Sequence, residues 1–235
     1  MPTQAQQTNF SGFLPAGGSG DSGWEQAGAA LYDPVIKRQY GGRSSSIQVV
    51  NVGPVNTTVS ATFYSDSGIA RTTGPYSIAA NGKVTIQPYD GSGSGGCDAN
   101  GTICAVRIVS NNGQPLVGIV QEFSDSTLLT TTTHNMFSAG ANTVYFPVVK
   151  NQYGNMTTGL RLQNAGSAAT VMTVSYYNQP GVAQCTLSSP SVPARAAYTF
   201  SPCTAAGFVG SVVVVNVVNN SPTGDNQAIY NASNR

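Results

Sequence analysis

Apolar and polar residues alternate with a period of two along much of this chain. The clearest run is Thr58–Ser65, in which one set of alternate side chains is apolar and the other carries hydroxyl groups. This pattern is typical of strands with one buried face, and no long stretch shows the 3.6-residue period of an amphipathic helix. We therefore predict an all-β fold with almost no helix. The expected strands are Ile47–Val52, Thr58–Ser65, Lys83–Gln87, Cys104–Ser110, Pro115–Phe123, Ala197–Phe200, Gly210–Val218 and Gln227–Asn231.

Turn-forming residues separate these runs at short intervals. Glycine follows serine or asparagine at Ser67-Gly68, Asn81-Gly82 and Asn112-Gly113, and a glycine-rich segment fills residues 90–96. Such pairs favour tight connections between antiparallel strands. Short strands at this spacing predict sandwiches of two packed antiparallel sheets.

One stretch of sequence occurs twice. Residues 32–41 read YDPVIKRQYG and residues 145–154 read YFPVVKNQYG, 113 positions later. At the same offset further residues correspond: Trp24 to Phe137, Asn51 to Asn164, Gly53 to Gly166, and Phe63-Tyr64 to Tyr176-Tyr177. Solenoid repeats have periods of 20 to 50 residues, so this longer period indicates a duplicated domain. We predict an extended N-terminal arm at residues 1–23, a first β-sandwich at 24–136 and a second at 137–235.

The alternation keeps the same register in both copies. Val59, Ala61 and Phe63 form the apolar set of the first copy, and Met172, Val174 and Tyr176 form that of the second. A shift of one residue would exchange the two faces of a strand, so the shared register predicts the same fold for both copies.

Several short segments carry a family resemblance. The Pro-Val-x4-Tyr-Gly motif, QNAGS at 163–167, VSYY at 174–177 and GFVGS at 207–211 resemble tandem Ig-like β-sandwich repeats of secreted bacterial cell-surface proteins. The resemblance covers residues 24–235 and implies an extracellular, largely non-catalytic role. The first copy departs from the pattern at Asp33, where the second copy has Phe146, at Val52, and at 102–104.

Charged residues are few and unevenly distributed. The chain has ten Lys or Arg and nine Asp or Glu, and no basic cluster exceeds Lys37-Arg38, which excludes the usual electrostatic signature of a nucleic-acid-binding protein. Residues 1–140 hold six basic and eight acidic side chains, and residues 141–235 hold four basic side chains and only Asp225. The resulting charges of −2 and +3 would favour head-to-tail stacking of subunits, although isolated surface charges contribute little energy.

The four cysteines divide evenly between the copies. We expect disulfides Cys97–Cys104 and Cys185–Cys203, and hence an oxidising compartment, either secreted or at the cell surface. Zinc is the alternative, but neither copy has a Cys-x-x-Cys motif and His134 is the only histidine. The most apolar run, residues 207–218, is too short to cross a bilayer, so we expect no membrane span.

Catalytic chemistry has few candidates. His134 lies among threonines, aligns near Tyr230 of the second copy, and is interpreted as a solvated residue at the end of a strand. No Gly-x-Ser-x-Gly motif supplies a nucleophile. Glu122 is the one acid of the first copy outside a predicted turn that could pair with a second carboxylate. We predict no enzymatic activity, no cofactor and no metal site.

Two other chemistries remain open at this point. Calcium could bind the glycine-rich loop Asp90–Gly96, which has alternating oxygen donors but no glutamate at its twelfth position. The repeated pairs Lys37 with Asn51 and Lys150 with Asn164 would allow Lys–Asn isopeptide bonds. That reaction needs a buried carboxylate, for which Glu122 is available only in the first copy.

The arm contains an apolar island within a Gln- and Gly-rich segment. Phe10, Phe13 and Leu14 would fill apolar pockets if the arm added a strand to the sheet of another subunit. This predicts a structural role, as a homopolymeric filament, stalk or surface coat. The alternative is an adhesive module that binds cell-surface glycans through exposed rings, for which the candidates are Tyr64, Tyr76, Tyr89, Tyr153, Tyr176 and Tyr177.

Overall fold

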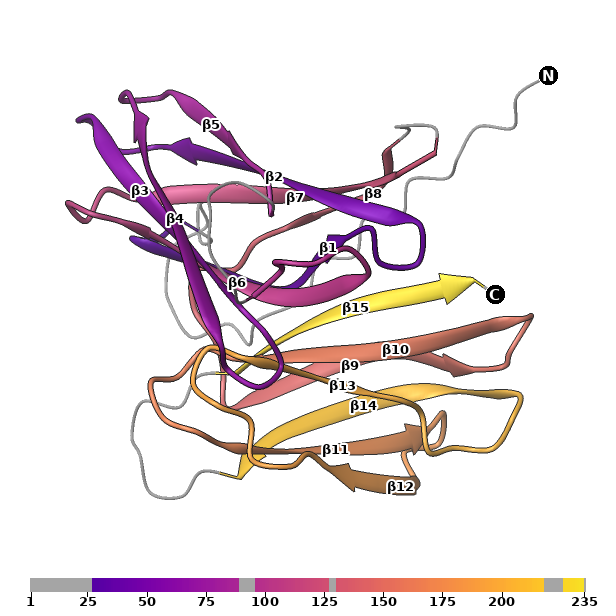
Figure 1. Ribbon diagram of the computed structural model, residues 1–235. Helices are drawn as coiled ribbons and strands as arrows, with labels where there is room; N and C mark the ends of the chain where they lie inside the picture. The colour runs from indigo at the N-terminus through magenta and orange to yellow at the C-terminus, as the bar shows by residue number, and fades with distance from the viewer. Residues whose placement is uncertain (1–26, 89–95, 127–129, 218–225, 235) are drawn as a thin grey trace. The chain divides into compact units, whose positions relative to one another are not determined.

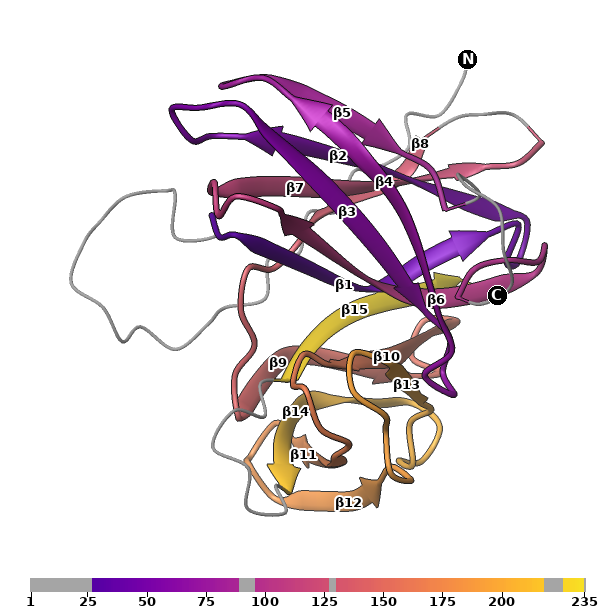
Figure 2. The ribbon, with the colours of Figure 1, turned by 60° about the vertical axis from the view of Figure 1, so that its left-hand side comes forward.

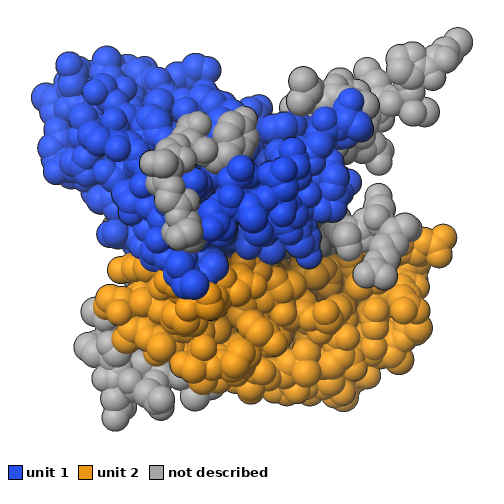
Figure 3. All heavy atoms as spheres, in the orientation of Figure 1, with its two compact units in different colours: residues 1–11, 19–65, 69–139 blue, residues 12–18, 66–68, 140–235 orange. Residues whose placement is uncertain are grey.

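The computed structural model describes residues 27–88, 96–126, 130–217 and 226–234 (Figure 1). All regular structure in these residues is β-strand, as the alternation predicts, and no helix occurs among them. The chain divides into two compact units, one holding strands β1 to β8 and the other β9 to β15 (Figure 3). The predicted arm at residues 1–23 lies outside the described residues.

The first unit consists of two antiparallel four-stranded sheets. One has the order β1-β6-β3-β4 and the other β5-β2-β7-β8 (Figures 1 and 2). The eight strands are β1 (Ala30–Arg38), β2 (Arg43–Asn51), β3 (Thr57–Tyr64), β4 (Ala70–Ile78), β5 (Lys83–Ile86), β6 (Thr102–Ser110), β7 (Leu116–Ser124) and β8 (Thr130–Asn135).

The second unit repeats this strand order. Its sheets have the orders β12-β11-β14-β9 and β13-β10-β15, so β9 to β15 correspond in turn to β1 to β7. The bounds are β9 (Thr143–Asn151), β10 (Met156–Asn164), β11 (Val171–Asn178), β12 (Ala183–Ser188), β13 (Ala197–Phe200), β14 (Phe208–Val217) and β15 (Asn226–Asn234). Within the described residues β8 has no counterpart in the second unit.

The core of each unit lies between its sheets, and the predicted register of the third strand is confirmed. Val59, Ala61 and Phe63 are fully buried, as are their counterparts on β11, whose exposed fractions do not exceed 1%. These faces join two separate apolar clusters, one in each unit. A one-residue slip would place hydroxyl groups in these cores, so burial fixes the register.

The repeated Pro-Val-x4-Tyr-Gly motif encodes a bulge followed by a hairpin. The pairing of β1 with β6 shifts between Asp33 and Ile36, and the pairing of β9 with β14 shifts between Phe146 and Val149. Proline lacks the N–H that a regular ladder needs, and in both units it occupies this shift. The motif is visible in the sequence, but proline interrupts the alternation, so no strand could be predicted there.

The hairpin that follows the bulge is a two-residue turn in each unit. Gly41 and Gly42 have φ of 60° and 72°, and Gly154 and Asn155 have φ of 57° and 60°. Two consecutive positive φ values define a type I′ turn, which matches the twist of antiparallel strands. Glycine and asparagine adopt this conformation at low cost, which explains why Tyr-Gly recurs in both copies.

Candidate functional site

Four ionisable side chains from three strands meet inside the first unit. Asp33 and Lys37 lie on β1, Glu122 on β7 and His134 on β8. We call these four residues the charged cluster. Since β1 belongs to one sheet and β7 and β8 to the other, the cluster bridges the two layers of the sandwich.

Lys37 and Glu122 form a buried ion pair. Lys37 Nζ lies 2.9 Å from Glu122 Oε2, and the two side chains are only 6% and 2% exposed. Arg43 Nη1 lies 4.0 Å from the same oxygen and is partly exposed. A buried pair of this kind contributes little net stability, but removing one partner leaves the other charge without compensation.

Asp33 and His134 form the second pair of the cluster. Asp33 Oδ2 lies 2.9 Å from His134 Nε2, and Asp33 Oδ1 accepts a hydrogen bond of 2.7 Å from the backbone N–H of Val35. Burial raises the pKa of Asp33 despite its contacts with His134. Burial also opposes the charged form of His134, but the carboxylate of Asp33 outweighs it and raises the pKa of His134 above its usual value.

The chemical capacity of the cluster is limited. A histidine oriented by an aspartate is two thirds of a catalytic triad, and the third part is a nucleophile within hydrogen-bond reach. Among the described residues, no serine, threonine or cysteine side chain hydrogen-bonds to His134. The four groups form two pairs across the sandwich, Lys37 with Glu122 and Asp33 with His134.

Two features of His134 differ from the interpretation made from sequence. It is not a solvated residue, because its side chain is only 14% exposed and is bonded to Asp33. It also does not correspond to Tyr230, since Tyr230 pairs with Leu160 as Val120 pairs with Ile47. The sequence signal for a buried partner of His134 is Asp33, a charged residue at a position where the other copy has Phe146.

The charged cluster is not repeated at the corresponding positions of the second unit. Phe146 occupies the position of Asp33, and the register of β15 on β10 places Ala232 where Glu122 stands. Lys150 keeps the position of Lys37, but it lies 4.0 Å from Met156 Sδ and 5.7 Å from the centre of the Tyr153 ring. The ionisable chemistry of the first unit is therefore not duplicated.

The hydrogen bonds that shape the backbone are duplicated. The N–H of Lys37 donates to Ser45 Oγ at 2.9 Å, and the N–H of Lys150 donates to Thr158 Oγ1 at 3.0 Å. These bonds involve residues at the same offset of 113. The two units thus share hydrogen bonds that shape the backbone.

The repeated asparagines are also scaffold residues. Asn51 Oδ1 accepts a bond of 3.0 Å from the N–H of Gly53, and its amide donates to the carbonyls of Val55 and Ala79. Asn164 repeats this arrangement with Gly166, Ala168 and Val192. Each asparagine fixes the loop after its strand as an Asx turn.

The Lys–Asn isopeptide hypothesis is therefore not supported. The Asn51 amide is taken up by loop carbonyls, and the Lys37 amine lies against Glu122.

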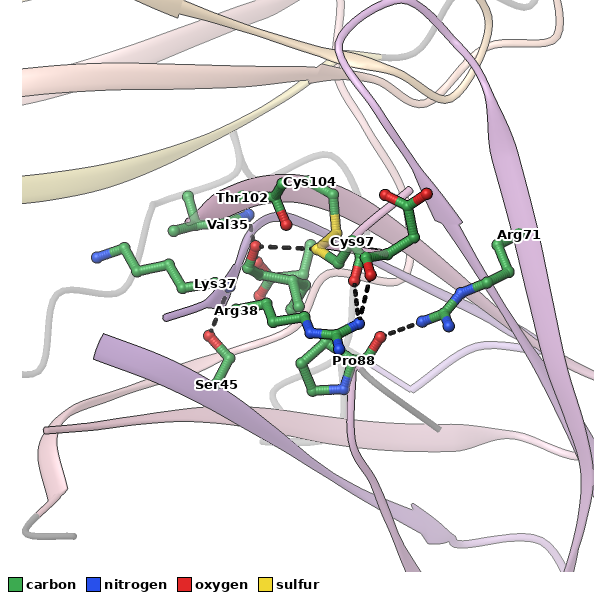
Figure 4. Close-up of a disulfide and its surroundings, with 12 residues drawn as sticks. Val35, Lys37, Arg38, Ser45, Arg71, Pro88, Cys97, Thr102 and Cys104 are labelled. Atoms are coloured by element: carbon green, nitrogen blue, oxygen red, sulfur yellow. Dashed lines mark hydrogen bonds between the residues drawn. A yellow bond between two sulfur atoms is a disulfide. The ribbon is translucent and has the colours of Figure 1, made fainter. Parts of the chain in front are cut away.

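Both predicted cysteine pairs are disulfide-bonded in the structure, one in each unit. Cys97–Cys104 has a Cα–Cα distance of 5.6 Å and Cys185–Cys203 one of 6.2 Å. The loop carrying Cys97 is held further by Arg38, whose guanidinium donates to the carbonyls of Cys97 and Asp98 (Figure 4). Cys185 lies on β12, and Cys203 lies in the connection after β13.

The remaining candidates give no organised site. Among the described residues no group of three or more His, Cys, Asp or Glu could hold a metal ion, and the calcium hypothesis falls largely on residues 89–95, outside that part of the chain. Tyr176, proposed as an exposed ring, is buried in the core, whereas Tyr153 is 51% exposed. No helix in the described ranges is long and apolar enough to span a membrane.

One open depression lies in the first unit. It has a volume of about 520 Å³ and is lined by amide, hydroxyl and small apolar groups from the ends of β3 and β4 and from the turn after β6. Two of its amides are engaged locally, because Asn112 donates to the carbonyl of Asn56 and Asn111 donates to Thr58 Oγ1. No aromatic ring lines it.

Comparison with known proteins assigns no family, because no protein-family model and no curated protein matches this chain.

Proposed function

We propose that this protein is a non-enzymatic structural protein, secreted or at the cell surface, and a subunit of a filament, stalk or surface coat. It consists of tandem Ig-like sandwiches and assembles by strand addition and head-to-tail contacts between copies. The proposal rests on a selective duplication: the features that shape the backbone occur in both units, but most of the charged cluster occurs only in the first. The bulge, the type I′ hairpin and the Asx turn recur in both units, whereas of the charged cluster only the lysine recurs.

Selective duplication favours a structural role over a catalytic one. If the cluster were a reaction centre, its side chains would need access to a substrate. They are instead buried and paired across the sheets. Two disulfides support an oxidising compartment, because such bonds are rarely maintained in the cytosol.

The Ig-like assignment rests on the inner strands. In an Ig domain the second strand pairs with the fifth and the third with the sixth, as β2 with β5 and β3 with β6 do here. The first and seventh strands are exchanged, since β1 pairs with β6 and β7 with β2. We assign an Ig-like sandwich with exchanged outer strands.

The surface composition supports self-association. Only 8% of residues are charged, so copies of the chain repel one another weakly. Several large apolar side chains are exposed on the second unit, among them Tyr145, Val148 and Val215. These positions lie on the adjoining strands β9 and β14.

Electron microscopy of the full-length protein tests the proposal. Unbranched filaments or an ordered coat are expected at concentrations where sedimentation velocity shows large species. A protein that stays monomeric across the whole soluble concentration range would rule out the polymer.

A second candidate, glycan binding, is favoured by the depression lined by Asn56, Asn111 and Asn112. A glycan array probed with the wild type and with Asn111→Ala tests it, and signals that the variant loses would support it. Wild-type signals that persist in the variant, or none at all, would exclude this depression as the site.

A further inference from the structure

The first unit is completed by the segment that follows β8. The N–H of Met136 donates to the carbonyl of Gly118 on β7 at 2.8 Å, and the Met136 side chain is buried in the core. Phe137 then pairs with Tyr32 on β1 through two backbone hydrogen bonds of 2.7 and 3.0 Å. The segment thus binds strands of both sheets and closes one open side of the sandwich.

In the second unit, no segment among the described residues covers the equivalent edge. The register of β9 on β14 repeats that of β1 on β6, with Tyr145 opposite Val213 as Tyr32 is opposite Arg107. The N–H and C=O of Tyr145 therefore face away from β14. Within the described part of the chain no strand pairs with β9 on that side, and Tyr145 and Val148 are 55% and 44% exposed.

The repeat identifies a segment that matches this edge. The 113-residue offset relates Tyr32 to Tyr145, and it also relates Phe137 to Trp24. Phe137 precedes the second unit as Trp24 precedes the first. Gly28 is four residues after Trp24 and pairs with Leu116 of the first unit. In sequence, Trp24 therefore comes just before the first unit, as Phe137 comes just before β9.

We infer that the segment around Trp24 of one copy pairs with β9 of a second copy at Tyr145, as Phe137 pairs with Tyr32 within a single chain. This inference rests on the proposed function and names the contact through which subunits join. Two backbone hydrogen bonds and the apolar contact of Trp24 with Tyr145 and Val148 define it. Because donor and receiver are different segments of the chain, the contact is heterologous and builds an open polymer or a ring.

Charge complementarity supports this partner. Asp21 and Glu25 flank Trp24, whereas residues 141–235 have four Lys or Arg and a single acid, Asp225; of these basic residues Arg161 is buried and already paired with Asp66. An acidic segment is therefore attracted to a basic unit, which speeds association more than it adds affinity. An exposed strand edge also offers unpaired backbone groups to any added strand.

Engineered cysteines test the contact. Directly opposite residues of an antiparallel pair have Cα atoms 4.5 to 5.5 Å apart, which a disulfide can span. Under mild oxidation, the full-length variant Trp24→Cys/Tyr145→Cys should form a ladder of covalent oligomers, and mass spectrometry should find peptides in which a disulfide joins positions 24 and 145. Tyr32→Cys/Phe137→Cys is the matched control and should cross-link within one chain, giving no ladder. Trp24→Cys/Val182→Cys places the second thiol on another exposed residue and should give no specific linkage.

The outcomes separate this inference from the proposed function. If the unmodified protein polymerises but the variant yields no peptide that joins positions 24 and 145, the inference is wrong and the structural role stands. If the unmodified protein stays monomeric at every concentration, the proposed function fails and the inference fails with it.

Discussion

Replacing Glu122 by glutamine should destabilise the first unit strongly. Glutamine is nearly isosteric with glutamate but removes the carboxylate that lies 2.9 Å from Lys37 Nζ. The ammonium would then remain between the sheets in a side chain only 6% exposed, with its counterion gone. Breaking a buried pair in this way costs about 3–5 kcal/mol. The reverse change, Lys37→Met, should cost less, because Glu122 keeps the guanidinium of Arg43 at 4.0 Å.

The second unit supplies a matched control. Lys150→Met removes the equivalent lysine, which has a thioether and an aromatic ring as neighbours, and should change stability by no more than about 1 kcal/mol. The double variant Lys37→Met/Glu122→Leu should recover most of the loss, since apolar pairs often replace buried ion pairs without cost. Native-state hydrogen exchange, followed by mass spectrometry on β7 and β11 peptides, reports the two units separately. A change below about 1 kcal/mol for Glu122→Gln would refute the claim that Lys37 depends on this carboxylate.

Three further changes have defined outcomes. Tyr176→Phe should leave the free energy of unfolding of the second unit unchanged or raise it by about 1 kcal/mol. The buried Tyr176 hydroxyl has no hydrogen-bond partner among the described residues, and the first copy has Phe63 at this position. A clear loss of stability in urea unfolding would contradict this. Asp33 raises the pKa of His134 in the folded protein. Protonated His134 therefore stabilises the fold fully below about pH 6.5, and this contribution is lost as the pH rises through the raised pKa. His134→Gln should flatten that dependence, and an unchanged pH profile would show that His134 does not cause it. Deleting residues 1–26, which removes the arm together with Trp24, should leave the circular dichroism spectrum unchanged and abolish polymers; equal assembly of the truncated chain would show that this segment is not required.

The strands and their buried faces could be predicted because alternation is a local signal. Val59, Ala61 and Phe63 are recognisable as one face without any knowledge of their partners. The cysteine pairs were also predictable, since an even count divided between two copies leaves one pairing within each. Strands such as β4 were missed, because Gly74 and Pro75 interrupt an otherwise polar run.

The charged cluster could not be predicted in the same way. Its members come from positions up to 101 residues apart, and only the exchange of β1 into the sheet of β6 brings Asp33 and Lys37 towards β7 and β8. Pairing across sheets depends on strand order, which alternation does not encode. Glu122 and His134 are therefore recognisable from the sequence as reactive residue types, but their partners Lys37 and Asp33 are not.

Tryptophan fluorescence of the unmodified protein tests the central claim most directly. Trp24 is the only tryptophan, so its quenching by acrylamide reports on the proposed contact alone. On dilution from a concentration at which sedimentation shows polymers, the account predicts that quenching rises in step with the loss of polymer. Polymers that dissociate while Trp24 is quenched equally throughout would contradict it.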